Sequence, residues 1–185
     1  MNTTASRAAT GAHPPTSAPT SRPEGLAGMV IALIRLFERI PNSLIGLLAR
    51  FSIAAVFWRS GQTKVEGLEL NFVNGDFALG WPHLSESALD LFQNEYKLPF
   101  LPSELAAPMA AFAEHLFPLL LLFGLATRFS ALALLCMTLV IQVFVYPGAY
   151  ATHGTWAALL LYLMARGPGA FSIDHLLARR QRGRR

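Results

Sequence analysis

The sequence predicts an all-α integral membrane protein. We expect a four-helix bundle with an amphipathic N-terminal helix and a long outer loop that carries a short helix. Two observations predict this class. Of the 185 residues, 53% are apolar and only 14% are charged, whereas a soluble domain carries about 25% charged residues. The apolar residues also gather in four blocks, and residues 129–148 contain no Asp, Glu, Lys, Arg or His. Such blocks are typical of a chain that folds in a bilayer.

The same composition excludes several other classes. The lone cysteine, Cys136, rules out a disulfide scaffold or a cysteine-rich zinc module. The net charge of +4 comes from basic residues near the chain ends, so we expect no nucleic-acid partner. The sequence contains no motif for phosphate binding, dinucleotide binding or nucleophilic catalysis.

The N-terminal part divides into a tail and a helix. Residues 1–24 are mostly Thr, Ala, Ser and Pro and are expected to be disordered, because they can bury little apolar surface. Residues 25–41 are predicted to form an amphipathic helix at the membrane surface, which Pro41 ends. Its apolar residues recur at helical spacing: Leu26, Met29, Val30, Leu33, Ile34, Phe37 and Ile40.

The membrane domain is predicted over residues 43–166. The four spans are expected at about 43–63, 104–125, 129–147 and 149–166. Each is long enough to cross a hydrocarbon core of about 30 Å as a helix, and a spanning segment must satisfy its own backbone hydrogen bonds. The short turn at 126–128 indicates antiparallel packing of the second and third spans. No alternating strand pattern competes with the helices.

Charge predicts the orientation. Four arginines precede the first span and six follow the fourth, whereas the connection between the first two spans has two lysines and six acidic residues. The positive-inside rule then places both termini in the cytoplasm and the acidic connection outside. The basic tail, 167–185, is expected to begin with a short helix capped by Ser172, with Asp174 in its first turn. This tail either anchors the topology only or also favours anionic lipid.

The outer connection, of about forty residues, is long enough to require structure of its own. It contains Phe72, Phe77, Trp81, Phe92, Tyr96 and Phe100. A short helix is predicted from about Ser85 to Lys97, with Leu89, Phe92 and Tyr96 on one face. The segment would form either a cap on the bundle or a lid over a site.

Polar residues inside the spans are the candidate functional residues, because burying them in lipid is costly. Glu114 is expected near the midplane, where Arg50 of the first span would reach it as a salt-bridge partner. Arg59, Gln142 and His153 are expected to form a second polar layer, nearer the outer surface. Pro118 leaves the carbonyl of Glu114 without its helical N–H partner and predicts a bend there.

Two interpretations of this pair remain open. In the first, Glu114 and Arg50 handle protons or bind a quinone, and Arg59, Gln142 and His153 line the entrance. In the second, Glu114 and Arg50 form a structural salt bridge. A metal site at His115 and His153 is not expected, because the two lie at different levels. Cys136 is expected to be a small buried side chain rather than a redox group.

Several strings of the sequence, in order from about Leu44 to Leu177, resemble the DoxX family of small bacterial membrane proteins. They are Phe57-Trp58-Arg59-Ser60-Gly61 with Lys64, Leu91-Phe92 with Glu95-Tyr96-Lys97, Leu101-Pro102 with Glu104-Leu105-Ala106-Ala107, Gly124-Leu125-Ala126-Thr127-Arg128, Phe144-Val145-Tyr146-Pro147, His153 with Trp156, and Gly167-Pro168-Gly169 with Ser172, Asp174 and His175. The resemblance implies four transmembrane helices in the bacterial inner membrane. It also implies association with membrane redox systems, since the family takes its name from a subunit of a thiosulfate:quinone oxidoreductase. Glu114, Gly124 and Arg128 match a family pattern, whereas His115 departs from it.

The sequence therefore predicts an accessory subunit of a quinone-linked or oxidative-stress redox system in the membrane. Its expected partners are the lipid bilayer and redox subunits, with quinone as the candidate cofactor and homo-oligomerisation left open. The alternative is a membrane scaffold or assembly partner without its own chemistry. A small-solute or ion channel is favoured less, because four spans offer few pore-lining polar residues. Whether the protein is an enzyme is left open.

Overall fold

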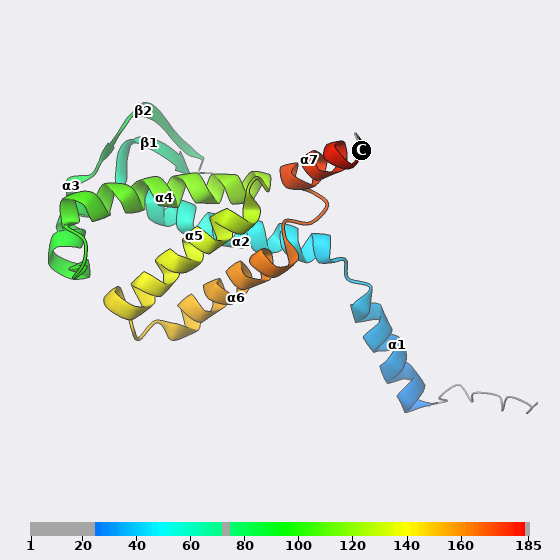
Figure 1. Cartoon of the computed structure of the whole chain (residues 1–185). Coiled ribbons are helices and arrows are strands. Elements are labelled where there is room, and N and C mark those ends of the chain that lie inside the picture. Colours follow the sequence, from blue (N-terminus) through cyan, green and yellow to red (C-terminus); the bar gives the residue numbers. More distant parts are fainter. Residues whose placement is uncertain (1–24, 72–74, 184–185) are drawn as a thin grey trace, which may run out of the picture. The chain divides into compact units, whose positions relative to one another are not determined.

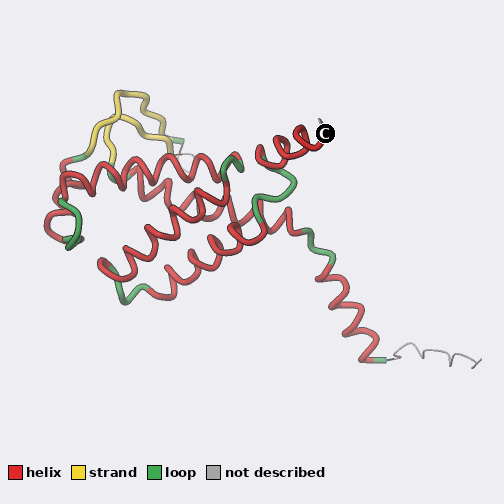
Figure 2. Tube along the Cα trace, viewed as in Figure 1, coloured by secondary structure: helices red, strands yellow, loops and turns green. Residues whose placement is uncertain are grey.

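The structure is a computed structural model that describes residues 25–71 and 75–183. The tail predicted to be disordered, residues 1–24, lies outside the described residues. The chain divides into two units, Met1–Arg39 and Ile40–Arg185, and each is described by itself. Helices make up most of the described residues, and the second unit also contains an antiparallel β-hairpin, drawn in yellow in Figure 2.

The first unit contains one described helix, α1, over Leu26–Glu38. A helix is therefore present within the predicted range 25–41, and it ends at Glu38, three residues before Pro41. No residue of α1 is buried. Its large apolar side chains, among them Leu26 and Met29 at 74% and 65% exposure, fit a helix that lies against lipid. Its position at the membrane surface stays a prediction.

The second unit contains the long helices. They are α2 (Asn42–Gln62), α4 (Ser103–Phe123), α5 (Thr127–Val140) with its π-helical continuation η2 (Ile141–Val145), and α6 (Tyr150–Arg166). Within the described residues, three helical segments are long and apolar enough to cross a membrane: α2, α4 and the stretch Thr127–Val145. The fourth predicted span, α6, has 17 residues and is the shortest of the set. These helices begin and end within about two residues of the ranges predicted for the four spans, and that all four cross the membrane stays a prediction.

The long helices pack around a shared apolar core. α2 contacts α4 and α6, and α5 contacts the same two helices (Figure 1). Ile53, Phe57, Leu121, Leu134 and Leu160 lie in this core, each at most 1% exposed. Many large apolar side chains point outward instead, as expected for helices surrounded by lipid: Leu48, Phe51, Phe112, Phe129, Leu132, Leu139 and Leu161.

The expectation of an all-α protein without strands is wrong, because the connection between α2 and α4 contains a β-hairpin. Strands β1 (Val65–Asn71) and β2 (Asp76–Leu84) pair antiparallel, with Leu68 opposite Leu79 and Leu70 opposite Phe77. A register shift lies between Glu66 and Leu68. At Gly67, φ is +83° and a Cβ would meet the carbonyl oxygen of Trp81 at 2.4 Å, so the close approach of the strands requires glycine. The alternation is short and interrupted, which conceals it in the sequence.

The helix predicted after the hairpin is present. α3 (Glu86–Leu91) begins after Ser85, whose side chain accepts a hydrogen bond from the Ala88 N–H. It continues as the π-helical turn η1 (Phe92–Tyr96) and ends at Lys97, which has a φ of +41°. The predicted face packs against α4, where Phe92 forms a cluster with Ala106 and Ala107.

A tyrosine contact connects η1 to the end of η2. The hydroxyl of Tyr146 donates a hydrogen bond to Glu95 Oε1, and the rings of Tyr96 and Tyr146 lie 5.8 Å apart, nearly edge-on. The carboxylate of Glu95 raises the pKa of Tyr146 above its usual value. Burial raises the pKa of Tyr96.

The last helix, α7 (Ile173–Arg182), lies at the opposite end of the long helices from the hairpin. Ser172 accepts a hydrogen bond from the His175 N–H and caps α7 as predicted. Asp174 has a second role, because its two carboxylate oxygens accept the N–H groups of Ala126 and Thr127, each at 2.9 Å. A residue of the tail therefore caps the first turn of α5.

Replacing Asp174 with Ala should destabilise the protein by about 2 kcal/mol, because the first-turn N–H groups of α5 lose an ionised acceptor. The thermal unfolding midpoint in detergent measures this effect. Asp90→Ala is the matched control, since the recorded hydrogen bond of Asp90, to Asn94, lies on an exposed surface. Equal midpoints for both variants would contradict the capping role.

The Tyr146 contact should produce a loss of stability at alkaline pH. A tyrosine pKa that is higher in the folded than in the unfolded state stabilises the fold below about pH 10, the unfolded value. This stability is lost as the pH rises from there toward the folded pKa. Tyr146→Phe should therefore flatten the decline of the unfolding midpoint above about pH 10. A wild-type midpoint that stays constant up to about pH 11, one unit above the unfolded tyrosine pKa, would argue against the contact.

Candidate functional site

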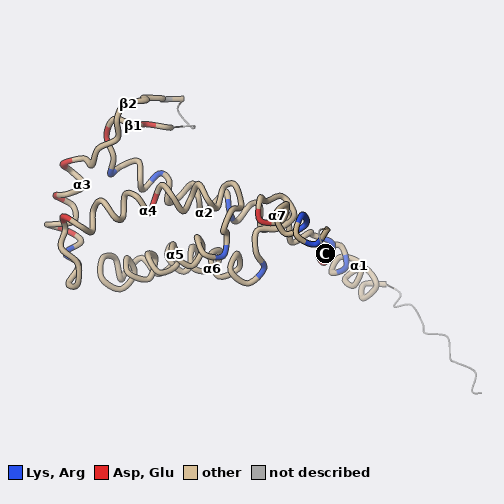
Figure 3. The backbone as a smooth tube through the Cα atoms, turned by 45° about the horizontal axis from the view of Figure 1, so that its top comes forward, with Lys and Arg blue, Asp and Glu red and all other residues tan. Residues whose placement is uncertain are grey.

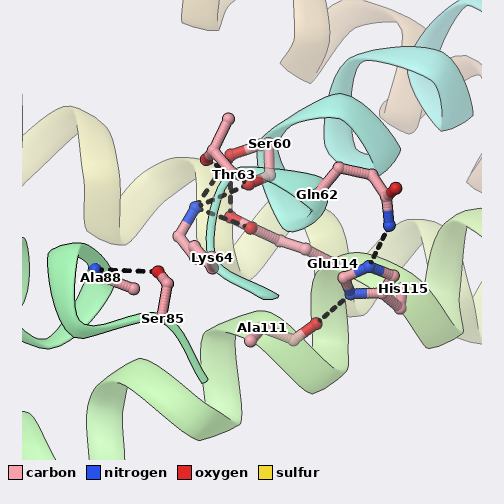
Figure 4. A network of polar contacts seen from close by, with 9 residues as sticks. All are labelled: Ser60, Gln62, Thr63, Lys64, Ser85, Ala88, Ala111, Glu114 and His115. Atoms are coloured by element: carbon pink, nitrogen blue, oxygen red, sulfur yellow. Dashed lines mark hydrogen bonds and ion pairs between the residues drawn. The ribbon is translucent and has the colours of Figure 1, made fainter. Parts of the chain in front are cut away.

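The candidate site surrounds Glu114, which lies midway along α4 and is only 3% exposed. Its Oε2 lies 2.7 Å from Lys64 Nζ, and its Oε1 accepts a hydrogen bond from Ser60 Oγ at 3.2 Å. Figure 4 shows the side chains of Glu114, Lys64 and Ser60 converging between α2 and α4. Glu114 therefore connects α4 to the last turn of α2 and to the residue that starts the hairpin segment.

Lys64 is as deeply buried as its partner, at 3% exposure. Its ammonium group donates to Glu114 Oε2, to the Ser60 carbonyl at 3.1 Å and to Ser60 Oγ at 3.0 Å. The three N–H donors thus have three acceptors, and a buried charge needs such complete pairing. The network is complete within the protein.

The predicted pairing of Glu114 with Arg50 is wrong. Arg50, 1% exposed, donates from Nη2 to the carbonyl of Phe171 at 2.5 Å and also faces Asp174. Its Nε and Nη1 have no hydrogen-bond partner among the described residues. The depth of Arg50 along its helix predicted that it could reach Glu114, but its side chain extends toward the α7 end. Lys64 instead folds back from the hairpin end into the interface between α2 and α4.

The predicted bend at Pro118 does not interrupt the helix. α4 continues from Ser103 to Phe123 through both Pro108 and Pro118, and Pro118 is fully buried. The close approach that shapes the site lies instead at Gly61 of α2. A Cβ on Gly61 would lie 2.8 Å from His115 Cε1 and 3.1 Å from Glu114 Cβ, so glycine lets the two helices meet at the site.

His115 forms a second polar network beside the ion pair. Its Nδ1 lies 2.7 Å from the Ala111 carbonyl, and its Nε2 lies 2.9 Å from Gln62 Nε2. Gln62 Oε1 accepts the Leu70 N–H at 2.8 Å, which leaves the amide nitrogen of Gln62 to donate to His115. Because a carbonyl only accepts, Nδ1 carries the proton, and His115 fits its surroundings as a neutral imidazole.

This second network holds the hairpin on the helices. Besides the Gln62 contact, Trp58 Nε1 donates to the Leu70 carbonyl at 3.3 Å, and the Trp58 ring lies 5.0 Å from the His115 ring, nearly edge-on. Sequence analysis did not assign roles to Lys64, Ser60, Gln62 and Trp58. Trp58, Ser60 and Lys64 belong to one string quoted for the family resemblance, which is the signal that could have identified them, and Gln62 lies between two of its residues.

A groove of about 1050 Å³ lies between α2, α4 and the hairpin. Its walls are mostly apolar, and its polar residues lie toward the C-terminal end of α2 and on β1. The residues of α2 and α4 that line it, with Thr63 just after α2, are Phe51, Ala54, Ala55, Trp58, Arg59, Gln62, Thr63, Pro118, Leu119, Leu122 and Phe123. A groove of this size can hold a lipophilic ring or chain.

The second predicted layer is only partly assembled. Gln142 Oε1 lies 2.7 Å from His153 Nδ1, and Gln142 Nε2 donates to the Pro147 carbonyl at 2.6 Å. Because that carbonyl only accepts, His153 donates from Nδ1. Arg59 is not part of this group: it is exposed on α2, lines the groove, and shares no recorded hydrogen bond with Gln142 or His153 in the described chain.

The remaining candidates lie apart from the network. No group of three or more His, Cys, Asp or Glu side chains that could bind a metal occurs in the described ranges. His115 and His153 lie on different helices, α4 and α6, with separate hydrogen-bond partners. Cys136 was expected to be buried, and this is wrong, because it is exposed on the outer face of α5.

Apolar helices that bury a charged network and expose large apolar side chains define a helical membrane protein. Comparison with known proteins identifies the family. The DoxX family model matches residues 45–147, and the chain belongs to this family. It is 28% identical over 144 residues, 71% of this chain and 82% of the relative, to a protein of Haemophilus influenzae described as uncharacterized. No solved structure matches the chain.

The structure predicts strong energetic coupling between Lys64 and Glu114. Removing one partner, in Lys64→Met or Glu114→Gln, should destabilise the protein by about 3–5 kcal/mol, because a buried charge loses its counter-charge. The double variant should recover much of this loss. The measurement is a double-mutant cycle of unfolding midpoints and folded yield in detergent.

Arg50 supplies the control for this cycle. Arg50→Met and Glu114→Gln should be additive to within about 0.5 kcal/mol, since the two side chains share no contact. Coupling of Glu114 to Arg50 rather than to Lys64 would restore the pairing predicted from sequence and contradict the structure.

Proposed function

We propose that this protein is an accessory subunit of a redox system in the bacterial inner membrane, and that it binds a quinone-like molecule in the groove between α2, α4 and the hairpin. The carrying observation is the position of the groove. Its apolar walls lead to Arg59 and Gln62, and Gln62 is hydrogen-bonded to His115 beside the buried ion pair. An apolar groove with a few polar groups at one end suits a ligand with a polar ring and a hydrocarbon tail.

The proposal assigns separate roles to the two parts of the site. Arg59 is exposed in the groove and would donate hydrogen bonds to a quinone oxygen. Lys64 and Glu114 would keep α2 and α4 at the spacing that forms the groove. Gln142 and His153 lie outside the residues that line the groove, so a direct role for them in the entrance has no support from their position.

Charge and helix length support the proposed topology. With α6 as a fourth crossing, both chain ends would lie on one side of the membrane, and the arginine distribution favours the cytoplasmic side. Figure 3 shows Lys and Arg gathered at the α7 end, whereas Asp and Glu gather around the hairpin and α3. At 17 residues, α6 would span about 26 Å, close to the hydrocarbon thickness.

A second candidate function is a scaffold without its own chemistry, and one observation favours it. Each donor of the Lys64 ammonium group and both oxygens of Glu114 already have partners within the protein. A network without a free donor or acceptor suits a structural role, in which the ion pair fixes the contact between two helices. In this function, partner subunits would bind the exposed helix faces.

Quinone content after purification distinguishes the two functions. Wild-type protein, extracted from quinone-containing membranes in mild detergent, should retain quinone detectable by chromatography of the organic extract. Ala55→Trp fills the groove and should lower the retained quinone by about fivefold or more, because the ring and the ligand cannot share the space. Ala158→Trp is the matched control, since Ala158 is exposed on α6 away from the groove.

The same purification identifies partner subunits by mass spectrometry. Equal quinone content in Ala55→Trp, Ala158→Trp and wild type would reject the groove as the site. Absence of quinone from all three, together with co-purifying membrane subunits, would favour the scaffold.

A further inference from the structure

A second pocket lies at the α7 end of the molecule, far along the helices from the Glu114 site. Its volume is about 860 Å³. It is open to the surface and is lined by the start of α2, the first turn of α5, the end of α6 and one side of α7. All of these segments belong to the second unit, so the pocket forms within one unit.

The pocket is strongly basic. Arg128 comes from the first turn of α5, Arg166 from the last residue of α6 and Arg182 from α7, and His175 joins them. None of the three arginines has a recorded ion-pair partner in the described part of the chain. Three unneutralised guanidinium groups around one pocket repel one another, so an anion between them would be bound favourably.

The one acid that lines the pocket, Asp174, sets a single negative charge against three arginines. Both oxygens of Asp174 already accept N–H groups, those of Ala126 and Thr127, and Asp174 also faces the buried Arg50. Its carboxylate therefore offsets only part of the positive charge of the pocket, which stays basic. The N–H groups of Arg128 and Phe129, in the same turn, have no acceptor within their helix, which adds donors to this side of the pocket.

Arg128 and the end of α6 are held close together. A Cβ on Gly167 would lie 3.7 Å from Arg128 Nη2 and 3.8 Å from its Nε. The guanidinium of Arg128 thus lies against the turn that follows Arg166. The hydroxyl of Thr127, which also lines the pocket, is fully buried and has no hydrogen-bond partner among the described residues.

The surroundings of the pocket indicate a lipid rather than a free ion. Phe129 of α5 lines the pocket and is 63% exposed, and Leu176 and Leu177 of α7, outside the lining, are 58% and 45% exposed. Exposed apolar side chains next to arginines are typical of the level where headgroups meet hydrocarbon. A soluble anion would gain nothing from this apolar rim.

We propose that this pocket binds the phosphate of an anionic phospholipid, with Arg128, Arg166 and Arg182 around the phosphate and the acyl chains along the apolar rim. Arginine suits this role because its planar fork donates two parallel hydrogen bonds to phosphate oxygens. The lipid would connect α7 to the ends of α5 and α6, so it would also hold the Asp174 cap in place. This site is independent of the quinone groove, at the other end of the helices.

Lipid binding to the full-length, delipidated protein tests the proposal by native mass spectrometry. Phosphatidylglycerol should bind about tenfold more tightly than phosphatidylcholine of the same chains, which carries no net charge. Arg128→Gln, Arg166→Gln and Arg182→Gln should each weaken phosphatidylglycerol binding by about fivefold. Arg180→Gln is the matched control, because Arg180 is on the same helix as Arg182 but does not line the pocket.

Three results would overturn the proposal. They are equal affinity for the two lipids, an equal loss of binding in Arg180→Gln, and inorganic phosphate that competes as well as the lipid does. The last would identify a site for a free anion. Arg182 is exposed near the end of α7, so Arg182→Gln gives a decisive result even where a variant in α5 or α6 fails to fold.

Discussion

The buried ion pair between Lys64 and Glu114 is the interaction on which the rest of the molecule depends. It joins the middle of α4 to the residue that follows the last helical turn of α2. Two opposite charges buried in a protein interior are tolerated only when each satisfies the other. The ammonium group and the carboxylate therefore set both the spacing of the two helices and the point at which the hairpin leaves them.

The hairpin shows how this constraint produces a candidate binding site. Once Lys64 is held in the helix interface, β1 starts beside α2, and the backbone of Leu70 reaches the side chains of Trp58 and Gln62. The hairpin then forms one wall of a groove whose other walls are α2 and α4. The groove is a consequence of chain connectivity near the ion pair, and its apolar lining follows from helices that otherwise face lipid.

The two ends of the molecule use charge in different ways. At the hairpin end, lysine and glutamate neutralise each other in a closed network. At the α7 end, Asp174 is engaged by the first turn of α5 and by Arg50, while the arginines around the second pocket have no recorded partner among the described residues. The first arrangement stabilises the protein internally, and the second presents an electrostatic attraction to an anion from outside.

The sequence by itself determined the membrane class, the positions of the long helices and the short helix after the hairpin, because apolar periodicity and capping residues act locally. Only the tertiary structure decided which cation meets Glu114 and that a hairpin forms. Arg50 lies in α2 and Lys64 follows it, so the sequence allows either cation to meet Glu114. Which of them does so depends on where each long side chain extends in space. The hairpin depends on contacts of β1 with Trp58 and Gln62, and no local pattern encodes them.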